Sequence, residues 1–227
     1  MRILFKYPTR DRPDWFKQTL KKYYSMMSGK TQYRFLITLN EDDETMNNLE
    51  MKVFMNGFPN LTYKYGNHKT KVEAVNADMQ NEDFDILVLV SDDMIPIVKD
   101  FDDVIVKAMK KHFPDLDGAL HFPDGKFRGT IITLSIMGKK LYDYFGYIYN
   151  PIYKSFGCDN EFRDIVYRIK KVAYIQRVII KHKWGGANKE NCKDVLYKRN
   201  FILGEEDGPL YCSRKQITRG LKRKVVM

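Results

Sequence analysis

Hydrophobic and polar positions along the first hundred residues follow the pattern of strands that alternate with helices. Apolar runs predict strands over residues 2–7, 33–39, 61–65 and 84–90. Between these runs, apolar residues recur at helical spacing over residues 14–27, 45–56 and 69–81. Short turns join the segments, which is typical of parallel α/β units. The uninterrupted apolar run 86–90 further indicates a central strand that is covered on both faces.

The pattern becomes mixed after residue 100. Helical spacing and apolar runs predict three more helices, over residues 101–113, 159–171 and 188–200, and three more strands, over residues 117–125, 129–138 and 172–184. No internal repeat or proline-rich linker interrupts the chain. The sequence therefore predicts one α/β domain over residues 1–205, with a mostly parallel central sheet and flanking helices. A basic C-terminal tail follows over residues 206–227.

Polar clusters follow three of the predicted strands. These clusters are PTRDRP at residues 8–13, NEDDE at residues 40–44 and SDDM at residues 91–94. The carboxyl ends of parallel strands meet at one edge of a sheet, where ligands bind in this class of fold. We therefore expect the three clusters to lie together at the edge where a nucleotide would bind.

Two adjacent carboxylates, Asp92 and Asp93, end the most apolar strand. Burying like charges side by side is unfavourable unless a cation or hydrogen-bond donors compensate them. Mg²⁺ and Mn²⁺ prefer oxygen ligands, and carboxylates commonly hold them together with substrate phosphates. The alternative is that one of the two aspartates caps a helix after Pro96, because Asp is a favoured N-cap residue.

A second acidic pair, Asp159 and Glu161, lies just before or within the first turn of the predicted helix 159–171. A carboxylate there suits a general base that deprotonates an acceptor hydroxyl. The helix dipole also favours carboxylates in a first turn, so capping is an equally good explanation. His182 follows an apolar strand. Imidazole is a common ligand in manganese-type sites, although a single histidine is more often structural.

Basic and polar residues complete the candidate site. Thr9, Arg10 and Arg12 follow the first strand, where guanidinium groups are suited to bind a pyrophosphate. Lys71 and Asn76 lie more than one turn apart on the predicted helix 69–81. For both groups the alternative explanation is a solvated loop or a solvated helix face.

Composition and charge narrow the classes of function. The chain has 227 residues and is 44% hydrophobic, which fits a single domain. Its net charge of +10, from 39 Lys and Arg against 29 Asp and Glu, favours anionic partners such as nucleotides, phosphorylated carriers, membrane surfaces or nucleic acid. A biased composition with thinly spread charge is the alternative. The tail is the exception, because six basic residues gather there: Arg214, Lys215, Arg219, Lys222, Arg223 and Lys224.

Cysteines and apolar segments indicate the compartment. Cys158, Cys192 and Cys212 form no CxxC pair, which argues against a disulfide framework or a structural zinc site. The N-terminal segment lacks the apolar core of a signal peptide, and no apolar run approaches the roughly 18 residues that span a bilayer. We therefore expect a soluble, cytoplasmic protein, located in the host cytoplasm if the source is viral.

In their order, these motifs resemble those of the GT-A fold glycosyltransferases, specifically the family 2-type enzymes that use nucleotide-diphospho-sugars. The resemblance covers residues 2–200 and is carried by YPTRDRP, NEDDET, KVEAVNAD, VLVSDDM, CDNEF and HKW. VLVSDDM stands where the family has its DxD metal motif, CDNEF where it has an acidic catalytic segment, and HKW where it has a late histidine. The chain departs from the family in three places. Ser91 replaces the first DxD carboxylate, Asn160 separates the two acidic residues of CDNEF, and no second His-Pro follows the late histidine.

The resemblance implies that residues 1–100 form a nucleotide-binding half and residues 101–205 an acceptor-binding half. Asp42 or Asp43 would contact the base or ribose. The other residues implied to border the nucleotide or the donor sugar are Pro8, Thr9, Arg10, Arg12, Lys71 and Asn76.

The resemblance also implies a metal site and a catalytic base. Asp93 would be the principal ligand of a divalent cation, Mn²⁺ or Mg²⁺, and His182 a later ligand. Asp92 would help to hold the diphosphate and the metal. Asp159 would be the general base, with Glu161 supporting it or taking its place.

The activity that the resemblance implies is transfer of a sugar from a nucleotide-diphosphate donor to an acceptor hydroxyl. A single direct displacement would invert the anomeric carbon. The acceptor would be a glycan or, given the positive charge, another anionic molecule such as modified DNA. Two alternatives remain. One is a nucleotidyltransferase of the same fold, against which the glycine-free PTRDRP loop argues. The other is a non-catalytic basic nucleic-acid-binding protein, for which no recognised motif is present.

Overall fold

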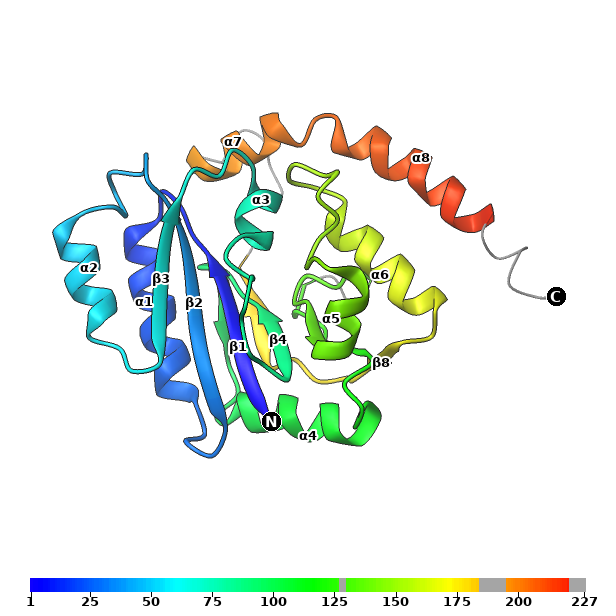
Figure 1. The fold of residues 1–227 in the computed structure, drawn as a ribbon, viewed down its shortest axis with the longest axis horizontal. Coiled ribbons are helices and arrows are strands. Elements are labelled where there is room, and N and C mark those ends of the chain that lie inside the picture. The colour runs from blue at the N-terminus through cyan, green and yellow to red at the C-terminus, as the bar shows by residue number, and fades with distance from the viewer. Residues whose placement is uncertain (127–129, 184–194, 221–227) are drawn as a thin grey trace.

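The computed structural model describes residues 1–126, 130–183 and 195–220. A seven-stranded sheet forms its centre (Figure 1). In spatial order the strands are β3 (Leu61–Gly66), β2 (Gln32–Asn40), β1 (Arg2–Pro8), β4 (Ile86–Leu89), β7 (Ile136–Gly138), β6 (Ala119–His121) and β8 (Val172–Tyr174). The first four strands are parallel, β7 is antiparallel to both of its neighbours, and β6 is parallel to β8. The predicted single α/β domain with a mostly parallel sheet is therefore confirmed.

A small second sheet pairs β5 (Met94–Pro96) with β9 (Ile180–His182) in antiparallel register. Eight helices are described: α1 (Pro13–Met26), α2 (Leu49–Asn56), α3 (Lys71–Asn76), α4 (Phe101–His112), α5 (Lys139–Phe145), α6 (Cys158–Arg168), α7 (Val195–Leu203) and α8 (Asp207–Gly220).

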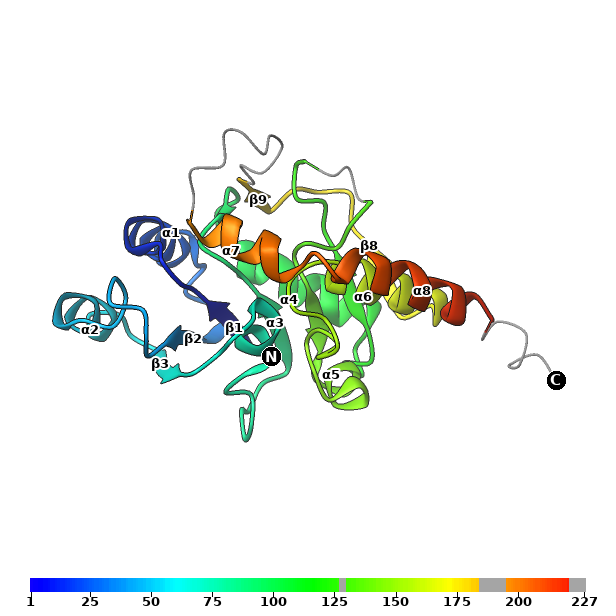
Figure 2. The same ribbon diagram turned by 90° about the horizontal axis from the view of Figure 1, so that it is seen from above.

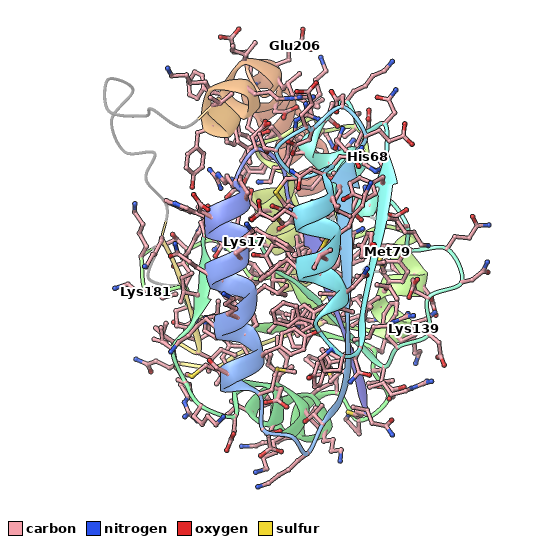
Figure 3. The ribbon with its side chains drawn as sticks, turned by 90° about the vertical axis from the view of Figure 1, so that its left-hand side faces the viewer. Lys17, His68, Met79, Lys139, Lys181 and Glu206 are labelled. Carbon is pink, nitrogen blue, oxygen red and sulfur yellow. The ribbon has the colours of Figure 1, made fainter. Side chains whose placement is uncertain are left out.

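Helices cover both faces of the central sheet, as the fully apolar β4 predicts. On one face α1, α2 and α4 pack over aromatic strand residues, and Phe5 of β1 stacks on Phe35 of β2 with ring centroids 4.7 Å apart. On the other face α3, α5 and α6 contribute Val72, Leu141 and Phe162 to a second cluster. Figure 3 shows α1 and α2 side by side over the first of these faces. Two filled cores thus hold the strand ends in fixed positions.

Local signals explain why several predicted helices are shorter than expected. The helix predicted over residues 45–56 begins only at Leu49, because the Asn48 side chain accepts a hydrogen bond from the Met51 N–H and caps it. The helix predicted over residues 69–81 is capped by Thr70 and ends at Asn76.

Three predicted strands are wrong in extent. Of the strand predicted over residues 117–125, only Ala119–His121 forms a strand, β6. Of the described residues 130–138, only 136–138 form a strand, β7, and residue 129 lies outside the described residues. Before β7 the Ser135 carbonyl accepts the Leu89 N–H at 2.9 Å, and the Thr133 hydroxyl donates to Asp124. Residues 172–184 form two short strands in different sheets, β8 and β9, because the chain leaves the central sheet after Tyr174. Residues 188–194 of the last predicted helix lie outside the described residues, and so does Trp184 of the HKW motif.

Two helices were not expected from the pattern. These are α5 and α8, and α8 occupies part of the segment interpreted as a basic tail. Residues 221–227 of that segment, with Lys222, Arg223 and Lys224, lie outside the described residues. Within the described part of the chain, no helix has the length and apolar character needed to cross a membrane.

Candidate functional site

A cavity of about 400 Å³ lies at the carboxyl ends of β1 and β4. Its walls come from the loops after these strands, the starts of α3 and α6, β9 and α7. Parallel α/β folds bind ligands at this edge, and the volume suits a small molecule. The sequence-predicted residues that line it are Pro8, Thr9, Arg10, Arg12, Lys71, Asp92, Asp93, Asp159 and His182.

Asp92 ties the loop after β4 to the loop after β1. Its carboxylate accepts hydrogen bonds from Arg12 Nη1 at 2.7 Å and Thr9 Oγ1 at 3.0 Å. Its backbone carbonyl accepts from Thr19 Oγ1 at 2.7 Å. Burial raises the pKa of Asp92 to about 6, although the Arg12 guanidinium acts in the opposite direction. Asp92 therefore fixes Arg12 in the cavity wall.

Asp93 is surrounded by converging donors. Its Oδ2 accepts a hydrogen bond from the Tyr197 hydroxyl at 2.6 Å and lies 3.4 Å from His182 Nε2. The Arg12 Nη1 atom is 3.7 Å from the same oxygen, and Ser91 Oγ donates to Oδ1 at 2.5 Å. Burial acts to raise the pKa of Asp93. Hydrogen bonds from His182, Ser91 and Tyr197 nevertheless hold it well below its usual range. Asp93 is thus an ionised carboxylate in the cavity wall.

Pairing of β9 with β5 brings His182 to Asp93. His182 lies opposite Met94 in the ladder, and the Lys183 N–H donates to the Asp93 carbonyl at 2.7 Å. On its other side, His182 Nδ1 is 3.6 Å from Asp124 Oδ2. Burial lowers the pKa of His182, but the two carboxylates outweigh it and raise the pKa to about 9.

Asp124 is a site residue that the sequence reasoning missed. It is buried, and its carboxylate accepts hydrogen bonds from Thr133 Oγ1 and the Lys126 N–H, each at 2.9 Å. Its carbonyl accepts the His182 N–H at 3.0 Å. Asp124 lies near the end of the strand predicted over residues 117–125 and three residues after β6, so the rule applied to Asp92 and Asp93, a carboxylate at a strand end, could have found it.

The helix-capping alternative for Asp92 and Asp93 is wrong. Strand β5 follows the two aspartates, and α4 begins only at Phe101. The residue before α4 is Asp100, which makes no side-chain capping bond.

The two acidic residues of CDNEF lie in different environments. Asp159, in the first turn of α6, lines the cavity, and its Oδ1 accepts the Asn160 N–H at 2.9 Å. Glu161 is buried away from the cavity and accepts from Asn150 Nδ2 at 2.8 Å and the Tyr153 hydroxyl at 2.6 Å.

Glu161 also forms a two-point ion pair with Arg214, whose Nε and Nη2 atoms lie 2.5 and 2.9 Å from its carboxylate oxygens. Burial opposes ionisation of Glu161, yet Arg214, Tyr153 and Asn150 lower its pKa. Both of its oxygens therefore bind groups of the protein itself.

Three other predicted donor-binding residues do not line the cavity. Asp42 is exposed and binds Arg10 Nη1 and Nη2 at 2.7 and 3.0 Å, which lowers its pKa to about 2. Asp43 is buried in the turn and accepts the Asp11 N–H at 2.8 Å. Asn76 accepts from the backbone of residues 148 and 149. These side chains organise the loops beside the cavity.

Helix α7 adds residues that the sequence did not point to. The Tyr197 ring lies 4.3 Å from the Arg12 guanidinium carbon, and Arg199 Nη2 donates to the Lys69 carbonyl at 3.1 Å. Seen from above in Figure 2, α7 lies across the end of the sheet. His68 also lines the cavity, and Figure 3 shows it at the same end of the molecule as Glu206.

The residues present can form part of a metal site. Asp93 and His182 offer one oxygen and one nitrogen 3.4 Å apart, and both donor types are ligands that would suit a divalent cation. In the described residues no three His, Cys, Asp or Glu side chains form a complete ligand group. The arrangement therefore fits a Mn²⁺ or Mg²⁺ ion that takes its other ligands from phosphate and water.

Similar solved structures are glycosyltransferases. A mannosyltransferase from Pyrobaculum calidifontis, in complex with GDP-Man and Mn²⁺, is 13% identical with a TM-score of 0.64, over 81% of this chain and 58% of that one. Residues 1–349 of TarS from S. aureus, in complex with UDP-GlcNAc, are 12% identical with a TM-score of 0.65, over 90% of this chain and 68% of that one.

A Drosophila β-1,4-galactosyltransferase 7, in complex with manganese, UDP-Gal and xylobiose, is 12% identical with a TM-score of 0.53, over 85% of this chain and 73% of that one. No protein-family model matches the chain, and no curated protein sequence does. The structural similarity shows that the chain has the GT-A fold found in nucleotide-sugar glycosyltransferases.

Proposed function

We propose that this chain, which has the GT-A fold, is a glycosyltransferase that uses a nucleotide-diphospho-sugar and a divalent cation. The observation that carries the proposal is the convergence of three side chains on one cavity. Asp93 and His182 stand 3.4 Å apart in one wall, and Asp159 lines the cavity from the start of α6. Similar solved structures with bound nucleotide-sugars and Mn²⁺ support the assignment.

The proposed donor side is positively charged. Arg10, Arg12 and Lys71 line the cavity beside Thr9. Asp92 orients the Arg12 guanidinium, and the Tyr197 ring packs against it. A guanidinium group held in this way is suited to a diphosphate, because its N–H groups match the phosphate oxygens. We assign the nucleotide to residues 1–100 and the acceptor to residues 101–205.

Asp93 and His182 would hold the cation. A bound divalent cation would neutralise charge on the departing nucleoside diphosphate. Asp124 faces the second ring nitrogen of His182 and keeps Nε2 directed at Asp93. The protein would thus orient the diphosphate with fixed groups from β4, β9 and α7.

Asp159 is the proposed general base. Its carboxylate lines the cavity, whereas that of Glu161 is engaged by Arg214. A base that receives the acceptor proton during one direct displacement gives inversion at the anomeric carbon. The net charge of +10 favours an anionic acceptor, either a glycan or modified DNA.

The proposal is tested by a donor screen. UDP-, GDP- and CDP-sugars are added with and without Mn²⁺, and thermal stabilisation and slow hydrolysis of the sugar nucleotide are measured. We expect the sugar nucleotides of one nucleobase to raise the melting temperature of the protein. This increase should be larger when Mn²⁺ is present. No response to any donor would contradict the proposal, and consumption of a nucleoside triphosphate with a sugar phosphate would favour the nucleotidyltransferase alternative. Steeply salt-dependent DNA binding without hydrolysis would favour the non-catalytic alternative.

A further inference from the structure

The C-terminal helix α8 begins with a buried carboxylate that has an unusual set of partners. Asp207 is 1% exposed and accepts hydrogen bonds from three consecutive backbone N–H groups. The donors are Lys154 at 3.1 Å, Ser155 at 2.6 Å and Phe156 at 2.8 Å. Bonds from N–H groups to an ionised carboxylate are stronger than neutral ones, and buried N–H groups without partners are costly. Asp207 therefore determines the conformation of residues 154–156.

This loop leads directly into the helix that carries the proposed base. Gly157 follows it with φ +74°, and Asp159 lies in the first turn of α6. A Cβ atom on Gly157 would stand only 3.1 Å from Tyr211 Cβ of α8, so the two segments are in close contact. A displacement of residues 154–156 would therefore move the start of α6 and the Asp159 carboxylate.

Further bonds hold α8 against α6. The Tyr211 hydroxyl donates to Asp164 Oδ2 at 2.7 Å, and Arg214 pairs with Glu161. Figure 2 shows α8 running along α6. On the opposite side of the loop, the Val72 N–H of α3 donates to the Lys154 carbonyl at 3.1 Å. The loop is thus fixed between α3, which carries Lys71, and α8.

We propose that α8 positions the catalytic base, with Asp207 as the positioning residue. Asp207 does not line the cavity, so it acts through residues 154–157 and not by contact with substrate. The role given to Asp159 rests on the proposed function. The hydrogen bonds by which Asp207 holds residues 154–156 do not depend on the proposed function. Helix α8 then contributes to the active site by fixing the position of Asp159.

The experiment compares Asp207→Asn with Glu206→Gln in the full chain. The Asn side chain keeps the shape of Asp but has no charge and one acceptor oxygen fewer. Glu206 is the neighbouring residue and is exposed, and among the described residues its carboxylate pairs with the exposed Lys154 Nζ at 2.7 Å, which makes it a matched control. Amide hydrogen exchange of residues 154–156 is measured first. We expect protection in the wild type and in Glu206→Gln, and at least tenfold faster exchange in Asp207→Asn.

Hydrolysis of the sugar nucleotide selected by the donor screen, with Mn²⁺, is measured next. We expect Asp207→Asn to lower turnover at least tenfold, while the dissociation constants of the nucleotide and of Mn²⁺ change less than twofold. The proposal is overturned if turnover is unchanged although the amides of residues 154–156 have lost their protection. It is also overturned if donor affinity and turnover fall by the same factor. If no sugar nucleotide binds the wild type, the proposed function fails, and the exchange result still decides whether Asp207 holds the loop.

A second variant covers the case in which Asp207→Asn does not fold. Tyr211→Phe removes only the hydroxyl that binds Asp164. It should raise loop exchange and lower turnover in the same direction, by a smaller factor. Wild-type turnover together with increased loop exchange in this variant also overturns the proposal.

Discussion

His182 Nε2 lies 3.4 Å from Asp93 Oδ2, although the two residues belong to segments far apart in the sequence. The β5–β9 pair, which is separate from the central sheet, creates this proximity by placing His182 opposite Met94. Asp124 faces the other ring nitrogen at 3.6 Å. The imidazole is therefore held between two buried carboxylates, an arrangement that orients it toward one of them.

Replacing Asp93 by Asn should weaken Mn²⁺ binding and nearly abolish turnover. The substitution removes the charged oxygen that faces His182, and we expect hydrolysis of the sugar nucleotide to fall by about 100-fold or more. Titration calorimetry with Mn²⁺ and a hydrolysis assay measure the two effects. Asp143→Asn, on the exposed side of α5, serves as the control. Wild-type turnover in Asp93→Asn would refute the metal-site assignment.

Replacing Asp124 by Asn should weaken Mn²⁺ binding without removing a ligand. The neutral amide is a weaker partner for the imidazole than a carboxylate, and loss of such an outer partner typically weakens metal affinity by about 10- to 100-fold. Nucleotide affinity without metal should remain within about twofold of the wild-type value, because Asp124 does not line the donor cavity. Equal Mn²⁺ affinity in variant and wild type would show that Asp124 is only structural.

Binding of Mn²⁺ should become stronger as pH rises. Burial lowers the pKa of His182, but Asp124 and Asp93 raise it to about 9. A metal ligand must be the neutral imidazole, so binding below this pKa releases a proton, and affinity should rise by up to about tenfold per pH unit. Calorimetry at several pH values below 9, in buffers of different ionisation enthalpy, measures this proton release. In His182→Gln the released proton and the pH slope should both disappear.

When no metal is added, the raised pKa of His182 predicts that the stability of the fold falls as pH rises, which is opposite to the trend in Mn²⁺ binding. Because the folded-state pKa is raised above the unfolded value, the charged imidazole stabilises the fold below about pH 6.5. This contribution is lost as pH rises through the folded pKa of about 9. Chemical denaturation of wild type and His182→Gln should therefore differ most at low pH and converge above pH 9.

The part of the site that the sequence predicts consists of residues at the ends of strands. The apolar run before Asp92 and Asp93 identifies a buried strand, and parallel strands bring such ends together with Thr9 and Arg12. The position of His182 does not follow from the hydrophobic pattern, because residues 172–184 divide between two sheets. Its role as a ligand was predicted from its place after an apolar run and from the resemblance.

The part of the site that the sequence could not predict depends on contacts between residues that are distant in sequence. Glu161 and Asp159 are nearly adjacent, and nothing local distinguishes them. The distinction comes from Arg214, which neutralises Glu161 from a segment interpreted as a tail. Tyr197 is similar, because its contact with Asp93 depends on where α7 lies over the sheet. Such pairs are fixed by tertiary packing and leave no periodic signal.

Substitutions in the acidic pair of α6 should separate catalysis from stability. Asp159→Asn removes a carboxylate from the cavity wall and breaks no ion pair among the described residues, so turnover should fall by about 100- to 1,000-fold with little change in melting temperature. Glu161→Gln leaves Arg214 without its charged partner. Glu161→Gln should lower the free energy of unfolding by about 2 kcal/mol. Its effect on the free energy of donor binding should be smaller than this.

Two measurements distinguish the pair. Urea denaturation reports the free energy of unfolding, and sugar nucleotide hydrolysis with Mn²⁺ reports turnover. Because its partners lower the pKa of Glu161, its stabilising contribution should be present at neutral pH and lost as pH falls through the folded pKa. The stability difference between wild type and Glu161→Gln should therefore shrink in acid. If Glu161→Gln abolishes turnover while the fold is intact and Asp159→Asn stays active, the base is Glu161, and the assignment of Asp159 is wrong.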